Sequence, residues 1–155
     1  EEMGIPLKDL IEKHAGGVIG GWNNLQAVIP GGSSMPLLPK NICDNITMDF
    51  DSLIAAKSGL GTAGIIVINK DQDIIKCMAR IARFYKHESC GQCTPCRVGT
   101  EKTVKEMKKE RWNKKDLKDL STVMTDSSIC GLGQAASNPL NSIIKHFSQA
   151  IEFNE

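Results

Sequence analysis

Apolar residues recur at a helical period through the second half of the chain, beginning near residue 71. The first predicted helix runs into a loop at 86–96, and its apolar face consists of Ile74, Ile75, Met78, Ile81, Ala82 and Tyr85. Two further helices are predicted at 98–111 and 114–124. A fourth begins near Pro139, and its apolar positions are Leu140, Ile143, Ile144, Phe147 and Ile151. Four amphipathic helices joined by short loops predict a helical bundle.

The first half of the chain has shorter elements. A short helix is predicted at 6–14, because a proline suits its first turn and glycines follow its last. Strands are predicted at 25–29 and 65–68, where apolar residues lie between turn-forming residues. We therefore predict the α+β class, with a small α+β domain at 1–69 and a helical domain at 70–155.

Two glycine clusters adjoin the predicted strands, Gly31-Gly32 and Gly59-Leu60-Gly61 with Gly64. Neither cluster has the G-x-G-x-x-G fingerprint of a dinucleotide-binding loop in a complete strand–turn–helix context, nor a P-loop lysine followed by serine or threonine. We expect turns and close backbone packing at these glycines instead.

Cysteine spacing is the most specific chemical signal in the chain. Cys90, Cys93 and Cys96 follow one another at C-x2-C-x2-C spacing, in the loop after the first predicted helix. Cys130 follows the third predicted helix, so the bundle can bring both loops to the same end. Four thiolates are the ligand set of a [4Fe–4S] cluster. We predict that these four cysteines hold such a cluster and that the chain transfers electrons.

Other readings of the cysteines remain open at this point. A zinc-stabilised interaction domain would use the same thiolates, although structural zinc sites usually draw ligands from two separate C-x2-C or H-x3-H pairs. A thioredoxin-like redox pair lacks the preceding βαβ pattern. Disulfides are disfavoured, since nothing indicates secretion. No catalytic constellation of Ser, His and Asp or of paired carboxylates is present, so no catalytic residue is predicted.

The polar residues near the cysteines indicate a functional role less specifically than the cysteines do. His87 and Glu88 directly precede the first cysteine of the cluster, where they can bond to the loop backbone or tune a metal centre. Arg97 follows the third cysteine and can offset thiolate charge. The remaining cysteines, Cys43 and Cys77, are expected to be buried small hydrophobic residues.

Composition and charge exclude several classes of partner. The 155 residues are 41% hydrophobic and 24% charged, with a net charge of +1, so no overall field attracts nucleic acid. The longest apolar stretch, 64–68, is far shorter than the roughly 20 residues that span a bilayer, so no direct membrane insertion is expected. Alternating lysines and acids at 101–119 predict a solvated helix face.

Three segments resemble a known family. They are 27–34, 48–53 with 59–62, and above all 84–97, which carries the cysteine cluster. The chain resembles the NADH-binding flavoprotein subunit of respiratory complex I, which is the 51-kDa subunit in mitochondria and has a bacterial counterpart. In that family the corresponding cysteines ligate a [4Fe–4S] cluster, which the resemblance carries over to Cys90, Cys93, Cys96 and Cys130.

The resemblance implies a division of labour within a longer protein. The family has an N-terminal FMN- and NADH-binding domain, a ubiquitin-like β-grasp domain of the SLBB type and a helical cluster domain. This chain resembles the last two, and we expect it to begin inside the β-grasp domain, beyond the opening hairpin, which leaves a sheet edge unpaired. FMN and NAD are therefore implied for the parent subunit, and no residue of this chain is assigned to them.

The implied function is that of NADH:quinone oxidoreductase, a translocase of the respiratory chain. Electrons would pass from NADH-reduced FMN through the [4Fe–4S] cluster, and the segment alone would be inactive. The implied partners are the N-terminal FMN/NADH domain or chain and other iron–sulfur subunits of the peripheral arm. The implied location is the cytoplasmic face of a bacterial inner membrane or the mitochondrial matrix side.

One segment departs from the complex I pattern and is more similar to that of a related group of proteins. The run from Cys130 to Pro139 has glycine after the cysteine, where complex I proteins usually have alanine, and it lacks the acidic residue and tryptophan that follow. It is more similar to the diaphorase subunits of NAD(P)-linked hydrogenases and formate dehydrogenases. That alternative would place the protein in a hydrogenosome or the cytosol.

Overall fold

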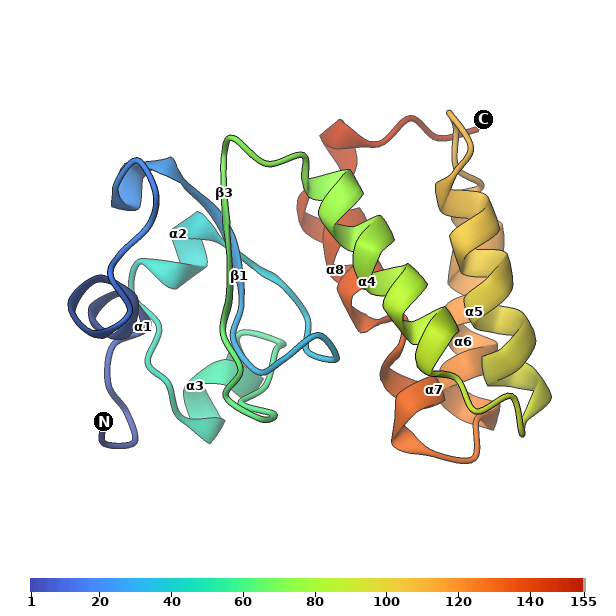
Figure 1. Cartoon of the computed structure of the whole chain (residues 1–155), viewed down its shortest axis with the longest axis horizontal. Helices are drawn as coiled ribbons and strands as arrows, with labels where there is room; N and C mark the ends of the chain where they lie inside the picture. Colours follow the sequence, from blue (N-terminus) through green and yellow to red (C-terminus); the bar gives the residue numbers. More distant parts are fainter. Residues whose placement is uncertain (155) are drawn as a thin grey trace. The chain divides into compact units, whose positions relative to one another are not determined.

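The computed structural model describes residues 1–154, which divide into two compact units, Glu1–Asp73 and a second from Ile74 onward. Helices combine with one small antiparallel sheet (Figure 1). This combination confirms the predicted α+β class.

The sheet of the first unit has three antiparallel strands in the order β2-β1-β3. The central strand β1, Leu25–Ile29, was predicted at these residues, and β3 spans Ile66–Asn69, one residue later than predicted. The sequence did not indicate β2, Leu38–Pro39, because two residues are too few for a period to appear. The hydrophobic core of this unit includes Leu7, Ile11, Leu25, Val28, Leu38, Cys43 and Leu53.

Short helices complete the first unit. The predicted helix at 6–14 is present as α1, Leu7–Asp9, continued by a π-helical segment, Leu10–His14. Two more helices are α2, Lys40–Cys43, and α3, Phe50–Ala55. A 3-10 turn at Trp22–Asn24 leads into β1. The sequence did not define the ends of α2 or α3, because four and six residues are too few to show an apolar period.

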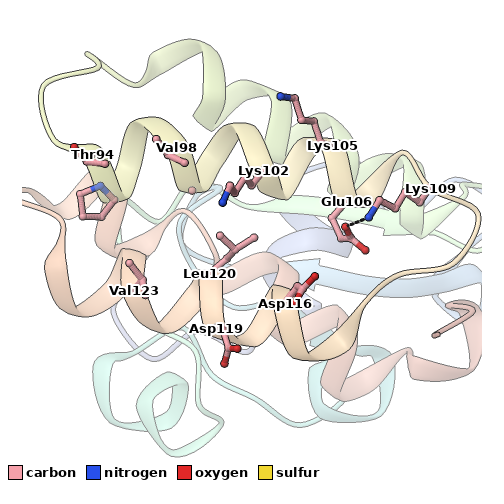
Figure 2. Close-up of a pocket in the computed structure, with 12 residues that line it drawn as sticks. Thr94, Val98, Lys102, Lys105, Glu106, Lys109, Asp116, Asp119, Leu120 and Val123 are labelled. Atoms are coloured by element: carbon pink, nitrogen blue, oxygen red, sulfur yellow. Dashed lines mark hydrogen bonds and ion pairs between the residues drawn. The ribbon is translucent and has the colours of Figure 1, made fainter. Parts of the chain in front are cut away.

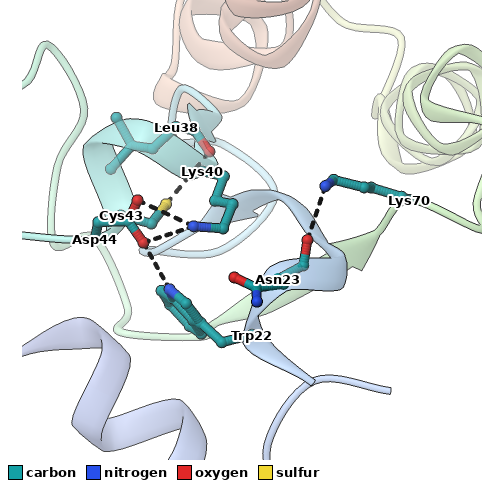
Figure 3. Close-up of polar contacts among 7 residues, drawn as sticks. All are labelled: Trp22, Asn23, Leu38, Lys40, Cys43, Asp44 and Lys70. Carbon is teal, nitrogen blue, oxygen red and sulfur yellow. Dashed lines mark hydrogen bonds and ion pairs between the residues drawn. The ribbon is translucent and has the colours of Figure 1, made fainter. Parts of the chain in front are cut away.

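A polar cluster joins the 3-10 turn to α2 (Figure 3). The Trp22 indole donates a hydrogen bond of 2.6 Å to Asp44, which also accepts from Lys40 at 2.9 Å. The bond from Lys40 and then that from Trp22 lower the pKa of Asp44. Beside them Cys43 is fully buried, as predicted, and burial followed by the charge of Asp44 raises its pKa to about 12.

Close backbone packing at the two glycine clusters was predicted, and the structure shows that they pack against each other. Gly32 N–H donates to the Gly64 carbonyl at 2.8 Å, and Thr62 N–H donates to the Gly31 carbonyl at 3.1 Å. A Cβ built on Gly61 would lie 2.2 Å from the Gly31 oxygen, and Gly61 has a φ of 48°. Only glycine allows this backbone approach.

The second unit is a bundle of four long helices. They are α4, Ile74–Glu88; α5, Thr94–Met107; α6, Lys114–Ser127; and α8, Asn138–His146. Helix α5 packs against both α4 and α6, and α8 packs against α4 (Figure 1). A short helix, α7, Gly131–Ala135, precedes α8 and contacts α5 and α6.

Several boundaries in the bundle differ from the prediction, and one short helix was not predicted. Helix α5 ends at Met107 instead of residue 111, and α6 ends at Ser127 instead of residue 124. Helix α5 begins at Thr94 instead of residue 98, because Pro95 occupies its first turn. Helix α8 ends at His146, so Ile151 lies outside it. Helix α7 was not predicted, since five residues give no apolar period.

The predicted solvated face at 101–119 is wrong at Glu106, which is 6% exposed. Its carboxylate accepts from Lys109 at 2.5 Å and from the Asn113 backbone N–H at 2.7 Å. Burial is the largest single influence and raises the pKa of Glu106, but these two hydrogen bonds and the charge of Lys109 together lower the pKa below its usual value. Within residues 1–154, no helix is long and apolar enough to cross a membrane.

Candidate iron–sulfur site

Three of the predicted cysteines lie at the N-terminal ends of two helices, and the fourth lies in a loop. Cys90 is exposed in the loop between α4 and α5. Cys93 directly precedes α5, and Cys96 is buried in its first turn. Cys130 is exposed and directly precedes α7. All four are free thiols.

The two cysteine-bearing loops meet at one end of the bundle (Figure 1). Cys93 lies beside the backbone N–H groups of Ile129 and Cys96, which lower the pKa of its thiol in that order. On the other side of the junction, a Cβ built on Gly133 would lie 2.9 Å from Cys96 Cβ. Cys93 and Cys96 are therefore packed against the segment that carries Cys130.

The structure does not gather the four thiols around one ion. Among residues 1–154, no three His, Cys, Asp or Glu side chains are arranged to hold a single metal. A [4Fe–4S] cluster binds each thiolate at a different iron, so its ligands need not meet at one point. Ligation by Cys90, Cys93, Cys96 and Cys130 stays a prediction.

Local electrostatics suit thiolates. Cys93 and Cys130 directly precede α5 and α7, and the unpaired N–H groups of a helix N-terminus favour negative charge. Cys96 Sγ lies 3.2 Å from the Ser89 hydroxyl, which also accepts the Gly91 N–H at 3.4 Å. Donors of this kind fit a sulfur-ligated anionic cluster.

Two residues that support the site were not predicted, Ser128 and Gly133. The Ser128 hydroxyl is buried and forms no hydrogen bond of normal geometry, although it lies close enough to Cys93 to lower the pKa of that thiol. A Cβ built on Gly133 would lie 2.4 Å from this hydroxyl oxygen. The spacing of Gly133 from Cys130 was visible in the sequence, but the contact that requires a glycine there was not.

The polar residues beside the cysteines have other contacts. Arg97 donates to the Gly91 carbonyl and, at 3.2 Å, to the Thr94 hydroxyl, so it holds the loop in shape. His87 and Glu88 are exposed and contact each other at 2.9 Å. A tuning role for them, and charge compensation by Arg97, stay predictions. Cys77 is only half-buried, contrary to expectation.

A groove of about 770 Å³ runs between α5 and α6 (Figure 2). Lysines, including Lys102 and Lys105, lie on its α5 wall, and Asp116 and Asp119 lie on its α6 wall. It starts at Thr94, next to Cys93, but no cysteine lines it. The groove is therefore a feature separate from the cysteine site.

Family comparison divides the chain into two matched regions. The SLBB domain matches residues 1–75, which confirms the predicted domain type. The NADH-ubiquinone oxidoreductase-F iron-sulfur binding region matches residues 76–154, where all four predicted ligands lie.

Curated relatives are NADH dehydrogenase and NADH-quinone oxidoreductase subunits by name. The chain is 54% identical over 159 residues to the mitochondrial NADH dehydrogenase (ubiquinone) flavoprotein 1 of Dictyostelium discoideum, covering 98% of this chain and 33% of the relative. It is 55% identical to an NADH-quinone oxidoreductase subunit of Rickettsia bellii, covering 98% of this chain and 38% of the relative. The chain thus spans about a third of the length of these relatives.

Solved structures give a second comparison. A chain of NAD+-reducing [NiFe]-hydrogenase in the H2-reduced state superposes with a TM-score of 0.77 at 31% identity, covering 97% of this chain and 26% of that one. The same hydrogenase in the air-oxidised state superposes with a TM-score of 0.78 at 29% identity, covering 99% of this chain and 27% of that one. The sequence identity to the curated relatives is higher than the identity to the hydrogenase chain. The match to the iron-sulfur binding region, residues 76–154, spans half of the sequence. The chain belongs to the family described as the NADH-ubiquinone oxidoreductase-F iron-sulfur binding region.

Proposed function

We propose that this chain is the electron-transfer segment of a complex I flavoprotein subunit. Its parent subunit would oxidise NADH through FMN and pass electrons on through a [4Fe–4S] cluster bound by Cys90, Cys93, Cys96 and Cys130. The observation that carries the proposal is the close packing of Gly133 against Cys96, where an added Cβ would lie 2.9 Å from Cys96 Cβ, because it joins the cysteine cluster to the loop of the distant fourth cysteine.

The residues of this chain would hold and insulate the cofactor. When bound, a [4Fe–4S] cluster supplies a one-electron carrier whose potential depends on burial and on hydrogen bonds to sulfur. Cys96 would provide a buried anchor, while Cys90 and Cys130 lie on the exposed side of the site. The contact of Ser89 with Cys96 and the N–H groups near Cys93 would stabilise thiolate charge.

Assembly and location follow from the same proposal. FMN and NAD would bind to a preceding domain or a separate chain, and further iron–sulfur subunits of a multi-subunit complex would accept the electrons. The complex would lie on the mitochondrial matrix side or on the cytoplasmic face of a bacterial inner membrane. Mitochondrial and bacterial names among the relatives support both settings.

A second candidate is the diaphorase subunit of an NAD-linked hydrogenase. The superposition on the hydrogenase chain and the glycine after Cys130 favour it. Identities of 54% and 55% to complex I subunits, against 31% and 29% to the hydrogenase chain, favour complex I. The subunits that copurify with the protein would distinguish the two.

The test uses the complete subunit, purified anaerobically with every segment that its gene encodes. Adding NADH should reduce the flavin and produce the electron paramagnetic resonance signal of a reduced [4Fe–4S] cluster. A Cys130→Ser variant should still reduce its flavin but should lose this signal. Reduced flavin without a paramagnetic iron signal in the unmodified subunit would refute the proposal.

A further inference from the structure

Ser128 has a buried hydroxyl with no ordinary hydrogen-bond partner. The residue is 6% exposed, and its Oγ has no partner of normal geometry among residues 1–154. Its backbone is satisfied, because its N–H donates to the Met124 carbonyl at 3.2 Å and its carbonyl accepts from Gln134 at 3.0 Å. The unsatisfied group is therefore the hydroxyl alone.

The position of this hydroxyl is fixed by its neighbours. Gly133 is packed so closely against it that a Cβ there would meet Ser128 Oγ at 2.4 Å and Ser128 Cβ at 2.6 Å. The same Cβ would meet Cys96 Cβ at 2.9 Å, so Ser128 and Cys96 border one small space. The next residue, Ile129, presents its N–H to Cys93.

A buried hydroxyl without a partner costs roughly 1–3 kcal/mol. Native proteins seldom leave such a group unpaired unless it serves a ligand or a functional group. The acceptors available here are cysteine sulfurs, because Ser128 borders the same small space as Cys96 and its side chain is among the groups that act on the Cys93 thiol.

We propose that the Ser128 hydroxyl donates a hydrogen bond to the Cys93 thiolate when the cluster is bound, and that this bond raises the reduction potential. The inference rests on the proposed function, since it assumes that Cys93 is a cluster ligand. Reduction adds negative charge to the cluster and its sulfurs, so a donor at sulfur stabilises the reduced state more than the oxidised state. Removing the donor therefore disfavours reduction.

Ser89 and Ser128 would act on different ligands. Ser89 is half-buried and contacts Cys96 Sγ at 3.2 Å, whereas Ser128 is on the opposite loop, next to Cys93. The neighbouring Ser127 is exposed and is the last residue of α6. It offers a matched control with the same side chain in an exposed position.

The experiment is a redox titration of the complete, anaerobically purified subunit, followed by electron paramagnetic resonance. Ser128→Ala should keep its iron and shift the one-electron equilibrium about tenfold toward the oxidised form, which lowers the midpoint by about 59 mV. Ser127→Ala should keep the midpoint of the unmodified protein. Ser128→Thr, which retains a hydroxyl, should also stay close to it.

Each alternative result has a defined meaning. If Ser128→Ala keeps its cluster and the one-electron redox equilibrium of that cluster changes less than about twofold, the inference is wrong while the proposed function stands. If Ser128→Ala loses iron and Ser128→Thr keeps it at the original midpoint, the need for a hydroxyl is supported. Loss of iron from both variants would make the position a packing requirement and would overturn the inference. An unmodified subunit without iron would overturn the proposed function itself.

Discussion

Gly133 and Cys96 are held so close together that a single methyl group at Gly133 would lie 2.9 Å from Cys96 Cβ. The same methyl group would lie 2.4 Å from the Ser128 hydroxyl. Because α7 and the first turn of α5 are pressed together at this point, overpacking there should separate the two cysteine-bearing loops.

We therefore predict that Gly133→Ala destabilises the protein by about 1–3 kcal/mol and reduces the iron it retains. The matched control is Gly131→Ala in the same short helix, where an added Cβ meets nothing within 4 Å. Thermal unfolding and iron content, measured on both variants, test this. Equal stability and iron in the two variants would contradict the packing account.

The predicted ligand set divides the six cysteines into two groups. Replacing Cys93 or Cys130 by serine should reduce iron from about four atoms per chain to a small fraction of that value. Replacing Cys77, which lies on α4, should leave the iron content unchanged. Iron analysis after anaerobic reconstitution tests the division, and full iron in Cys130→Ser would exclude that residue as a ligand.

Thiol reactivity should follow burial and pKa. In the metal-free protein, exposed Cys90 and Cys130 should be alkylated first by iodoacetamide at pH 8. Cys43 should react last, because burial, followed by the charge of Asp44, raises its pKa to about 12 and leaves almost no thiolate. Peptide mass spectrometry of timed samples gives the order. Early alkylation of Cys43 in folded protein would contradict the described core.

Glu106 should make stability depend on pH. Its pKa is lowered in the folded protein, so its contribution is present above the usual value of 4.5 and is lost as pH falls through the lower, folded-state pKa. Glu106→Gln should cost about 1–3 kcal/mol at pH 7, because it removes the charge paired with Lys109 and weakens the bond to the Asn113 N–H. The cost should shrink in acid.

The control for this prediction is Glu110→Gln, since Glu110 is exposed. Unfolding temperatures of both variants and of the unmodified protein, measured at pH 7 and below 4.5, give the comparison. A penalty for Glu106→Gln that is the same at both pH values would show that charge is not the cause.

The sequence predicted the elements whose side chains repeat over several turns. Ile74, Met78 and Tyr85 mark the buried face of α4, and their spacing requires a helix. Helix α7 and strand β2 are too short for any such repeat, and tertiary contacts define them instead. The burial of Glu106 was missed for a related reason, because its partners Lys109 and Asn113 face it only after the chain turns between α5 and α6.

The same distinction applies to the site. Cysteine spacing identified the candidate ligands, because a three-cysteine cluster and a distant fourth cysteine form a pattern along the chain. Ser128 and Gly133 were not predicted, since an ordinary serine and glycine acquire their roles only when α7 packs against α5. Residues that support a site are set by packing, and the sequence alone does not reveal that packing.

The most direct test is the metal and sulfide content of the complete subunit, purified without oxygen, combined with electron paramagnetic resonance after reduction. The account predicts about four iron atoms and four sulfides per chain and a signal from a reduced [4Fe–4S] cluster that disappears in Cys93→Ser. One zinc ion per chain, or a chain without iron and sulfide, would contradict it.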